Sequence, residues 1–101
     1  MNIGAMSDQA VLAEIGHRLQ VHRLNLNLTQ AAVAEKAGVS RRALQKLESG
    51  ESCTLAILMR VLRAVGKLDA LQTFLPEPRL SPLQLAKLKG RERKRASRGR
   101  T

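Results

Sequence analysis

The sequence has 101 residues, which is enough for one small domain with a modest core and too few for two ordinary domains. Hydrophobic residues make up 44% of it but aromatic residues only 1%, which favours packed helices over a β-sandwich, and the net charge of +10 favours a polyanionic partner such as nucleic acid or an acidic membrane. The single cysteine, Cys53, excludes an intramolecular disulfide and a multi-cysteine zinc site, and no apolar run reaches the roughly 18 residues that span a bilayer.

The first predicted helix follows a flexible N-terminal segment, residues 1–7. Ser7 or Asp8 can cap this helix, because a short oxygen-bearing side chain accepts a hydrogen bond from an exposed backbone amide. Apolar residues recur at three- and four-residue spacing as far as about Leu24, which predicts a helix with one apolar face. The residues on this face are Val11, Leu12, Ile15 and Leu19.

Two short helices are predicted next, separated by a tight turn. Thr29 is a good N-cap for the second helix, which ends near Ala37. Gly38 forms the turn, because glycine takes the left-handed conformation that a sharp connection between helices requires. Ser40 caps the third helix, which ends near Glu48.

Two further helices are predicted before Pro76. The fourth covers residues 55–65, and the fifth covers about residues 68–75 and ends at the proline, which cannot continue a helix. The apolar residues of the fourth helix are Leu55, Leu58, Met59, Leu62 and Val65, and those of the fifth are Leu68, Leu71, Phe74 and Leu75. The prediction is therefore an all-α, five-helix domain over residues 8–75.

The sequence changes character after this domain. Residues 76–88 are a proline-containing extension, in which Ser81 and Pro82 predict the start of a short helix over Leu83 to Leu88. From Lys87 to the last residue there are eight basic residues and one acidic residue. We expect residues 89–101 to be a disordered basic tail, because a run of like charges with glycine has no apolar face to bury.

The second and third helices have a pattern that is typical of DNA recognition. Their apolar residues face one another across Gly38, which leaves an outer polar face on the third helix that consists of Arg41, Arg42, Gln45 and Lys46. Arginines at a helix N-terminus oppose the helix dipole at a cost of roughly a few tenths of a kcal/mol. Arg can bind guanine bidentately in the major groove and Gln can bind adenine, so the pattern indicates base reading. An ordinary solvated face is the alternative.

The stretch IGHRLQVHRLNLNLTQAAVAEKAGVSRRALQKLESG resembles the helix-turn-helix of the Cro/C1-type (XRE-family) repressors. The similarity covers about Leu12 to Leu75, and the Leu-Thr-Gln start, the Gly-Val-Ser turn and the final Glu-x-Gly all occur in register. It implies a lambda repressor-like fold. Leu47 departs from the family, which usually has an aromatic residue or Ile there, and this change affects packing more than base reading.

The resemblance also implies roles for individual residues. Gln30 matches the family's phosphate-contacting Gln at the start of the second helix, and Thr29 beside it is a further expected DNA-binding residue. Residues 40–46, beginning with Ser40, match the recognition helix that enters the major groove. For Gln30, a simple preference for a helix start is the alternative. Arg23 and Glu48 match a buried or half-buried ion pair between the first and third helices, for which two independent surface charges are the alternative.

The family resemblance further implies a homodimer that binds an inverted-repeat operator, with half-sites roughly 34 Å apart along the DNA. The expected dimer interface is the apolar stripe of the fifth helix, Leu68, Leu71, Phe74 and Leu75, although a core role for half of these residues is the alternative. The C-terminal extension resembles that of Hip-type antitoxins, which repress their own operon and bind a kinase-fold toxin. Residues expected to add nonspecific phosphate affinity are Lys89, Arg91, Arg93, Lys94 and Arg95.

The predicted function is therefore a sequence-specific, DNA-binding transcriptional repressor in the bacterial cytoplasm, associated with the nucleoid. The antitoxin version has a co-encoded kinase-fold toxin as a second partner. A nonspecific basic nucleic-acid-binding protein and a protein-interaction adaptor on a helix-turn-helix scaffold are the alternatives. We expect no enzyme activity, cofactor or metal site, because the sequence has no glycine-rich phosphate loop, no nucleophile with recognisable partners and no metal-binding His spacing.

Overall fold

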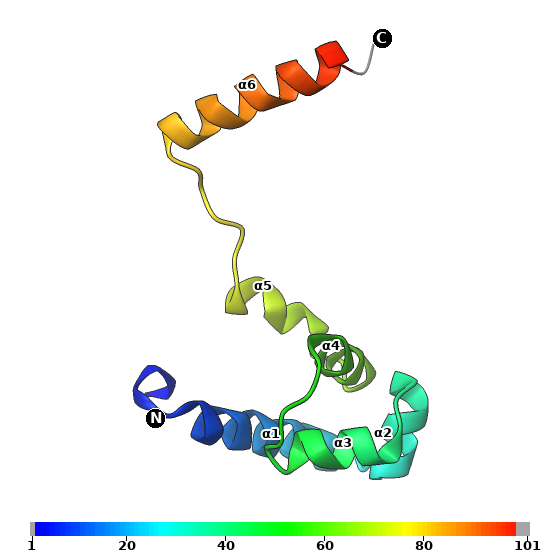
Figure 1. Ribbon diagram of the computed structural model, residues 1–101. Helices are drawn as coiled ribbons and strands as arrows, with labels where there is room; N and C mark the ends of the chain where they lie inside the picture. Colours follow the sequence, from blue (N-terminus) through cyan, green and yellow to red (C-terminus); the bar gives the residue numbers. More distant parts are fainter. Residues whose placement is uncertain (1, 99–101) are drawn as a thin grey trace. The chain divides into compact units, whose positions relative to one another are not determined.

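Helices make up all of the regular structure in the described part of the chain (Figure 1). The computed structural model describes residues 2–98, and only the backbone of residues 92–98. The predicted all-α class is confirmed for this range. The chain divides into two units, Met1–Leu71 and Gln72–Thr101. None of the helices in residues 2–98 has the length and hydrophobicity that crossing a membrane requires.

The first unit holds the first four predicted α-helices, and their observed ends agree with the predicted ones to about one residue. A short 3-10 helix precedes them, within the segment that was expected to be flexible, because the side chain of Asn2 accepts a hydrogen bond from the amide of Gly4 at 3.1 Å. The elements are η1 (Ile3–Ala5), α1 (Asp8–Asn25), α2 (Gln30–Ala37), α3 (Arg41–Glu48), α4 (Leu55–Ala64) and the 3-10 helix η2 (Leu68–Ala70).

Each of the four helices α1 to α4 begins at a hydroxyl cap. In every case the side-chain oxygen accepts a hydrogen bond from the amide three residues later, at 3.0–3.2 Å, so an otherwise unpaired helix amide is satisfied. The four caps are Ser7, Thr29, Ser40 and Thr54. These local signals explain why the helix starts could be read from the sequence.

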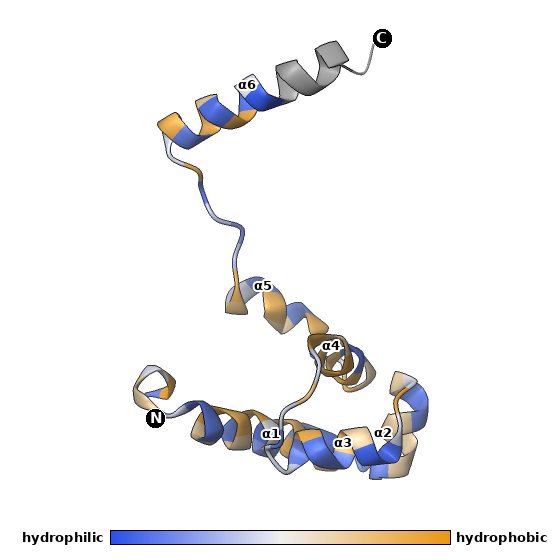
Figure 2. Cartoon of the chain, in the orientation of Figure 1, coloured by the Kyte–Doolittle hydropathy of each residue, from blue (hydrophilic) through white to orange (hydrophobic). Residues whose placement is uncertain are grey.

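The core of the first unit is aliphatic. It is built where α2 packs against α3 and α4 and where α1 packs against α3. Figure 2 shows that hydrophobic residues dominate α4, whereas α3 is largely hydrophilic. The buried core residues are Leu19, Val33, Ala34, Leu44, Leu47, Val61, Ala64 and Val65. On α4, by contrast, Leu55 and Met59 are exposed.

The predicted fifth helix is wrong as a single element. The 3-10 helix η2 is followed by α5 (Leu71–Phe74), which has only four residues. The backbone leaves the helical conformation at Leu75, because the ring of Pro76 disfavours that conformation in the residue before it.

The C-terminal helix is much longer than predicted. Helix α6 (Pro82–Arg98) begins where Ser81 accepts a hydrogen bond from the amide of Gln84 and continues through ten residues that were expected to be disordered. Gly90 does not end it, since an interior glycine costs only about 1 kcal/mol and its neighbours are strong helix formers. The expectation of a disordered tail is therefore wrong for residues 89–98, and residues 99–101 lie outside the described range.

Candidate nucleic-acid interface

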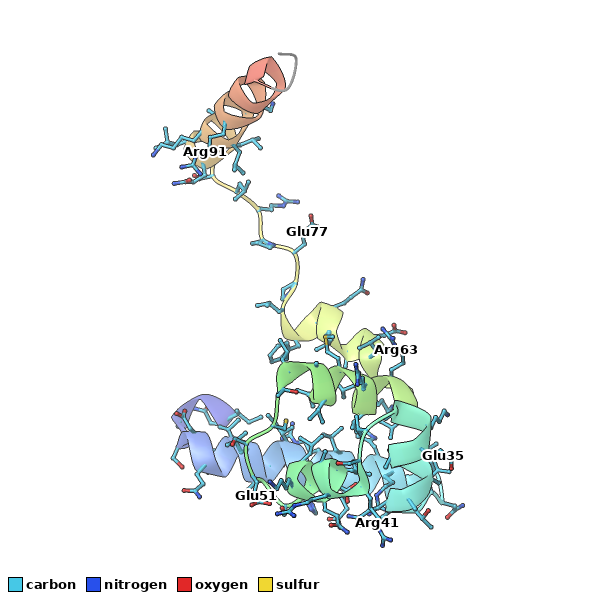
Figure 3. All side chains as sticks on the ribbon, turned by 45° about the vertical axis from the view of Figure 1, so that its right-hand side comes forward. Glu35, Arg41, Glu51, Arg63, Glu77 and Arg91 are labelled. Atoms are coloured by element: carbon cyan, nitrogen blue, oxygen red, sulfur yellow. The ribbon has the colours of Figure 1, made fainter. Side chains whose placement is uncertain are left out.

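The polar residues predicted to read DNA lie together on the exposed side of α3. Arg41, Arg42, Gln45 and Lys46 are all exposed, whereas Leu44 and Leu47 on the same helix are fully buried in the core. Figure 3 shows Arg41 at the edge of the first unit, with its side chain directed away from the other helices. The buried leucines therefore fix the rotation of α3 about its axis and hold the polar face outward.

A tight turn sets the angle between α2 and α3. Gly38 has a left-handed φ of 70°, and its amide donates to the carbonyls of Ala34 and Glu35. The amide of Val39 also donates to the carbonyl of Ala34, at 3.0 Å. Because Ala34 is buried and small, the two helices can approach closely.

A shallow depression of about 290 Å³ lies between α3 and the loop that leads to α4. Two cations, Arg42 and Lys46, line it on the α3 side. Its remaining lining residues are Ser40, Ala43, Ser52, Cys53, Thr54 and Ile57. Burial raises the pKa of the Cys53 thiol, which disfavours its thiolate form at neutral pH.

Arg23 and Glu48 form a buried ion pair between α1 and α3. The Nε of Arg23 donates to Glu48 at 2.7 Å and the Nη2 donates at 2.9 Å, while the Nη1 donates to the carbonyl of Leu28 at 2.8 Å. These hydrogen bonds with Glu48 raise the pKa of Arg23. The pair joins the end of α1, the loop before α2 and the end of α3, so it fixes α3 to the rest of the first unit.

Two glutamines extend this ion pair to the protein surface. The Nε2 of Gln30, at the start of α2, donates to the Oε1 of Glu48 at 3.1 Å. The Oε1 of Gln30 accepts from the Nε2 of Gln45 on the exposed face of α3, at 3.4 Å. The sequence placed Gln30 and Gln45 in separate roles, and the structure brings their side chains into contact.

The four residues predicted to form a dimer interface are divided between the two units and differ in exposure. Leu68 and Leu71 are half-buried in the first unit, whereas Phe74 and Leu75 belong to the second unit and are 73% and 76% exposed. Two of the four therefore have large free apolar surfaces.

The residues predicted for nonspecific phosphate contact all lie on α6. Lys89 and Arg91 are exposed. Arg93, Lys94 and Arg95 occupy the next turns of the same helix, and their side chains lie outside the described part of the chain.

Sequence reasoning missed a glycine that supports the site. Gly16 is buried in α1, where a Cβ atom would lie 2.6 Å from the carbonyl oxygen of Glu48 and also against that of Leu47. Its signal was a glycine in the interior of an amphipathic helix, which is unfavourable unless another backbone approaches there. Gly16 therefore allows α1 to contact the end of α3 directly.

Comparison with known proteins agrees with this arrangement. The helix-turn-helix family HTH_3 matches residues 19–69, about half of the chain. The chain belongs to the XRE-type helix-turn-helix family. This helix-turn-helix protein is 40% identical over 50 residues to a protein of Methanothermobacter thermautotrophicus named as an uncharacterized HTH-type transcriptional regulator, and the match covers 48% of this chain and 72% of that relative. The resemblance to Cro/C1-type regulators is thus confirmed, and the matched segment includes the whole polar face of α3.

Proposed function

We propose that this helix-turn-helix protein represses transcription by binding, as a homodimer, to an inverted-repeat operator in double-stranded DNA. One observation carries the proposal: the two arginines in the first turn of α3 are exposed, while the opposite side of the helix is anchored in the core by Leu44 and Leu47. A helix held in this way can enter the major groove with its N-terminal residues on base edges.

Within this proposal, α3 supplies the base contacts. Arg41 and Arg42 bind guanine O6 and N7, and Gln45 binds adenine; each good bidentate pair is worth about 1–3 kcal/mol of discrimination. Lys46 adds a further cation on the same face. Gln30 and the neighbouring Thr29, at the start of α2, contact backbone phosphates, which position the helix without specifying sequence. Ser40, the N-cap of α3, enters the major groove with that helix.

A dimer suits the size of this interface. One helix-turn-helix reads only a few base pairs, and a two-fold dimer doubles the site over half-sites roughly 34 Å apart. Phe74 and Leu75 are the most exposed large apolar residues among those described, so they are the proposed subunit contact, together with Leu68 and Leu71.

An antitoxin role, with a co-encoded kinase-fold toxin as partner, is the finer version of the proposal. It rests on the resemblance of the C-terminal extension to Hip-type antitoxins. Helix α6 and the residues before it supply exposed apolar side chains for such a protein contact, namely Leu80, Leu83, Leu85 and Leu88.

The test is selection of bound duplexes from a random DNA pool by the full chain, repeated with Arg41→Ala and Gln45→Ala at moderate salt. The expected result is an enriched inverted repeat with about one-turn spacing, which each variant degrades at its own position. Arg60→Ala is the matched control, because Arg60 is exposed on α4 and outside the recognition helix.

Two other results would contradict the proposal. Binding without an enriched motif, which fades as salt rises, would indicate a nonspecific basic protein. Absence of DNA binding by a folded chain would favour a protein-interaction adaptor.

A further inference from the structure

The negative charge of Glu48, in the buried ion pair, orients two successive hydrogen bonds that reach the exposed face of α3. Glu48 lies at its inner end and accepts hydrogen bonds from Arg23 and Gln30. A carboxylate paired with a guanidinium has only acceptors, so whatever contacts its remaining lone pairs must donate. Glu48 is buried, with 8% of its surface exposed, which leaves water little access as an alternative partner.

This constraint orients the amide of Gln30. Its NH2 group must face Glu48, because its carbonyl oxygen would there oppose a carboxylate oxygen at 3.1 Å. The Oε1 of Gln30 is consequently directed to the other side of the amide, where the Nε2 of Gln45 donates to it. At 3.4 Å this second hydrogen bond is long, so it biases the orientation of Gln45 rather than locking it.

The orientation of Gln45 matters because the two purines differ in their major-groove edges. Adenine presents the N6 donor and the N7 acceptor, whereas guanine presents two acceptors, O6 and N7. With one hydrogen of its NH2 group engaged by Gln30, Gln45 still has its Oε1 to accept from adenine N6 and a second hydrogen to donate to N7. Guanine offers no donor to that oxygen.

We propose that Glu48 and Gln30 are positioning residues that fix the polarity of the Gln45 amide, so that Gln45 selects adenine over guanine. This inference rests on the proposed function, and it assigns Gln30 a part in specificity in addition to any phosphate contact. The buried pair thereby acts on base selection as well as on stability.

The decisive variant is Gln30→Met, which keeps the length of the side chain and removes both amide hydrogen bonds. Gln45→Met removes the proposed base contact itself. The double variant Gln30→Met/Gln45→Met tests whether the effect of Gln30→Met requires Gln45. Gln9→Met is the matched control, since Gln9 is exposed on α1 away from the ion pair. Gln30→Asn, which retains polarity but is too short to span Glu48 and Gln45, provides a second variant if methionine prevents folding.

The measurement is the ratio of Kd values for two operator duplexes that carry adenine or guanine at the position degraded by Gln45→Ala. The expected wild-type preference for adenine is about fivefold or more, the lower limit for a good bidentate contact. Gln30→Met should lose most of this preference, and the double variant should lose no more than Gln45→Met alone, because the two residues act as one unit. Gln9→Met should keep it.

Other outcomes overturn the inference. If Gln30→Met weakens both duplexes by the same factor and leaves the ratio of their Kd values unchanged, Gln30 is a phosphate ligand only. A wild-type preference for guanine at this position also contradicts the proposed polarity. If the wild-type chain selects no motif at all, the proposed function fails first and the inference fails with it.

Discussion

The guanidinium of Arg23 holds the carboxylate of Glu48 through two hydrogen bonds, although the residues are 25 positions apart and almost fully buried. No buried side-chain nitrogen or oxygen in the described part of the chain is left without a hydrogen-bond partner. Removing either partner of such a buried, fully hydrogen-bonded pair destabilises the fold, because the charge that remains lies in a poorly solvated site.

We therefore predict that Arg23→Met lowers the free energy of unfolding by about 3–5 kcal/mol and that Arg23→Met/Glu48→Met recovers most of the loss. Urea unfolding followed by circular dichroism measures both. Arg18→Ala is the control: Arg18 pairs with Glu14 at 2.9 Å on the exposed face of α1, and its loss should cost no more than about 0.5 kcal/mol. A double variant as unstable as the single one would contradict this account.

The pH dependence of this pair follows from the raised pKa of Arg23. A group whose folded pKa is raised contributes stability that is fully present below its unfolded pKa and is lost only as pH rises through the folded value. For an arginine that window lies far above neutrality. The difference in unfolding free energy between wild type and Arg23→Met/Glu48→Met, which lacks both charges, should therefore stay constant across the neutral range, and a decline there would contradict the assignment.

Gly16→Ala should destabilise the first unit by about 1–3 kcal/mol, because the added methyl group would overlap the carbonyl oxygens at the end of α3. The matched control is Gly90→Ala on α6, where nothing lies near the added methyl group. That change removes an interior glycine and should raise helix content in far-UV circular dichroism. Equal unfolding midpoints for Gly16→Ala and wild type would show that α1 and α3 can separate without cost.

How far the sequence predicted this structure depended on the range of the interactions. The helix starts at Ser7, Thr29 and Ser40 and the turn at Gly38 are encoded within a few residues, so they were predictable. The length of α6 was not, because charge repulsion and helix propensity oppose one another there and the balance is small.

Longer-range features were harder to predict. On α4, apolar residues lie on most sides of the helix, so their spacing alone does not show which side is buried. The predicted apolar face therefore included Leu55 and Met59, which are exposed, and omitted Val61, which is buried. The pairing of Arg23 with Glu48 was expected from family resemblance rather than from spacing. The contact between Gln30 and Glu48 joins residues 18 apart and leaves no local pattern in the sequence.

The reactivity of Cys53 provides a direct test of its surroundings. Burial raises the pKa of this thiol, and only the thiolate reacts with iodoacetamide, so alkylation of the folded chain should require a higher pH than alkylation of the same chain unfolded in urea. Because the unfolded thiol ionises at a lower pH than the folded one, the free energy of unfolding should fall as pH rises past the pKa of the unfolded thiol. Cys53→Ser, which removes the single cysteine, is the blank. A folded midpoint at or below the unfolded one would mean that Arg42 and Lys46, which line the same depression, outweigh burial.

The basic residues of α6 should act on affinity and leave specificity unchanged. Replacing Lys89, Arg91, Arg93, Lys94 and Arg95 by Gln retains helix propensity, whereas deletion would shorten α6. Removing one cation that binds a phosphate flattens the dependence of log K on log salt by about 0.9, so the slope should fall by up to about 4.5 while the selected motif stays the same. Arg60→Gln/Arg63→Gln on the exposed side of α4 is the charge-matched control for two of the five changes and should keep the slope. An unchanged slope in the α6 variant would mean that the helix does not bind DNA and would leave its leucines and cations for a protein partner.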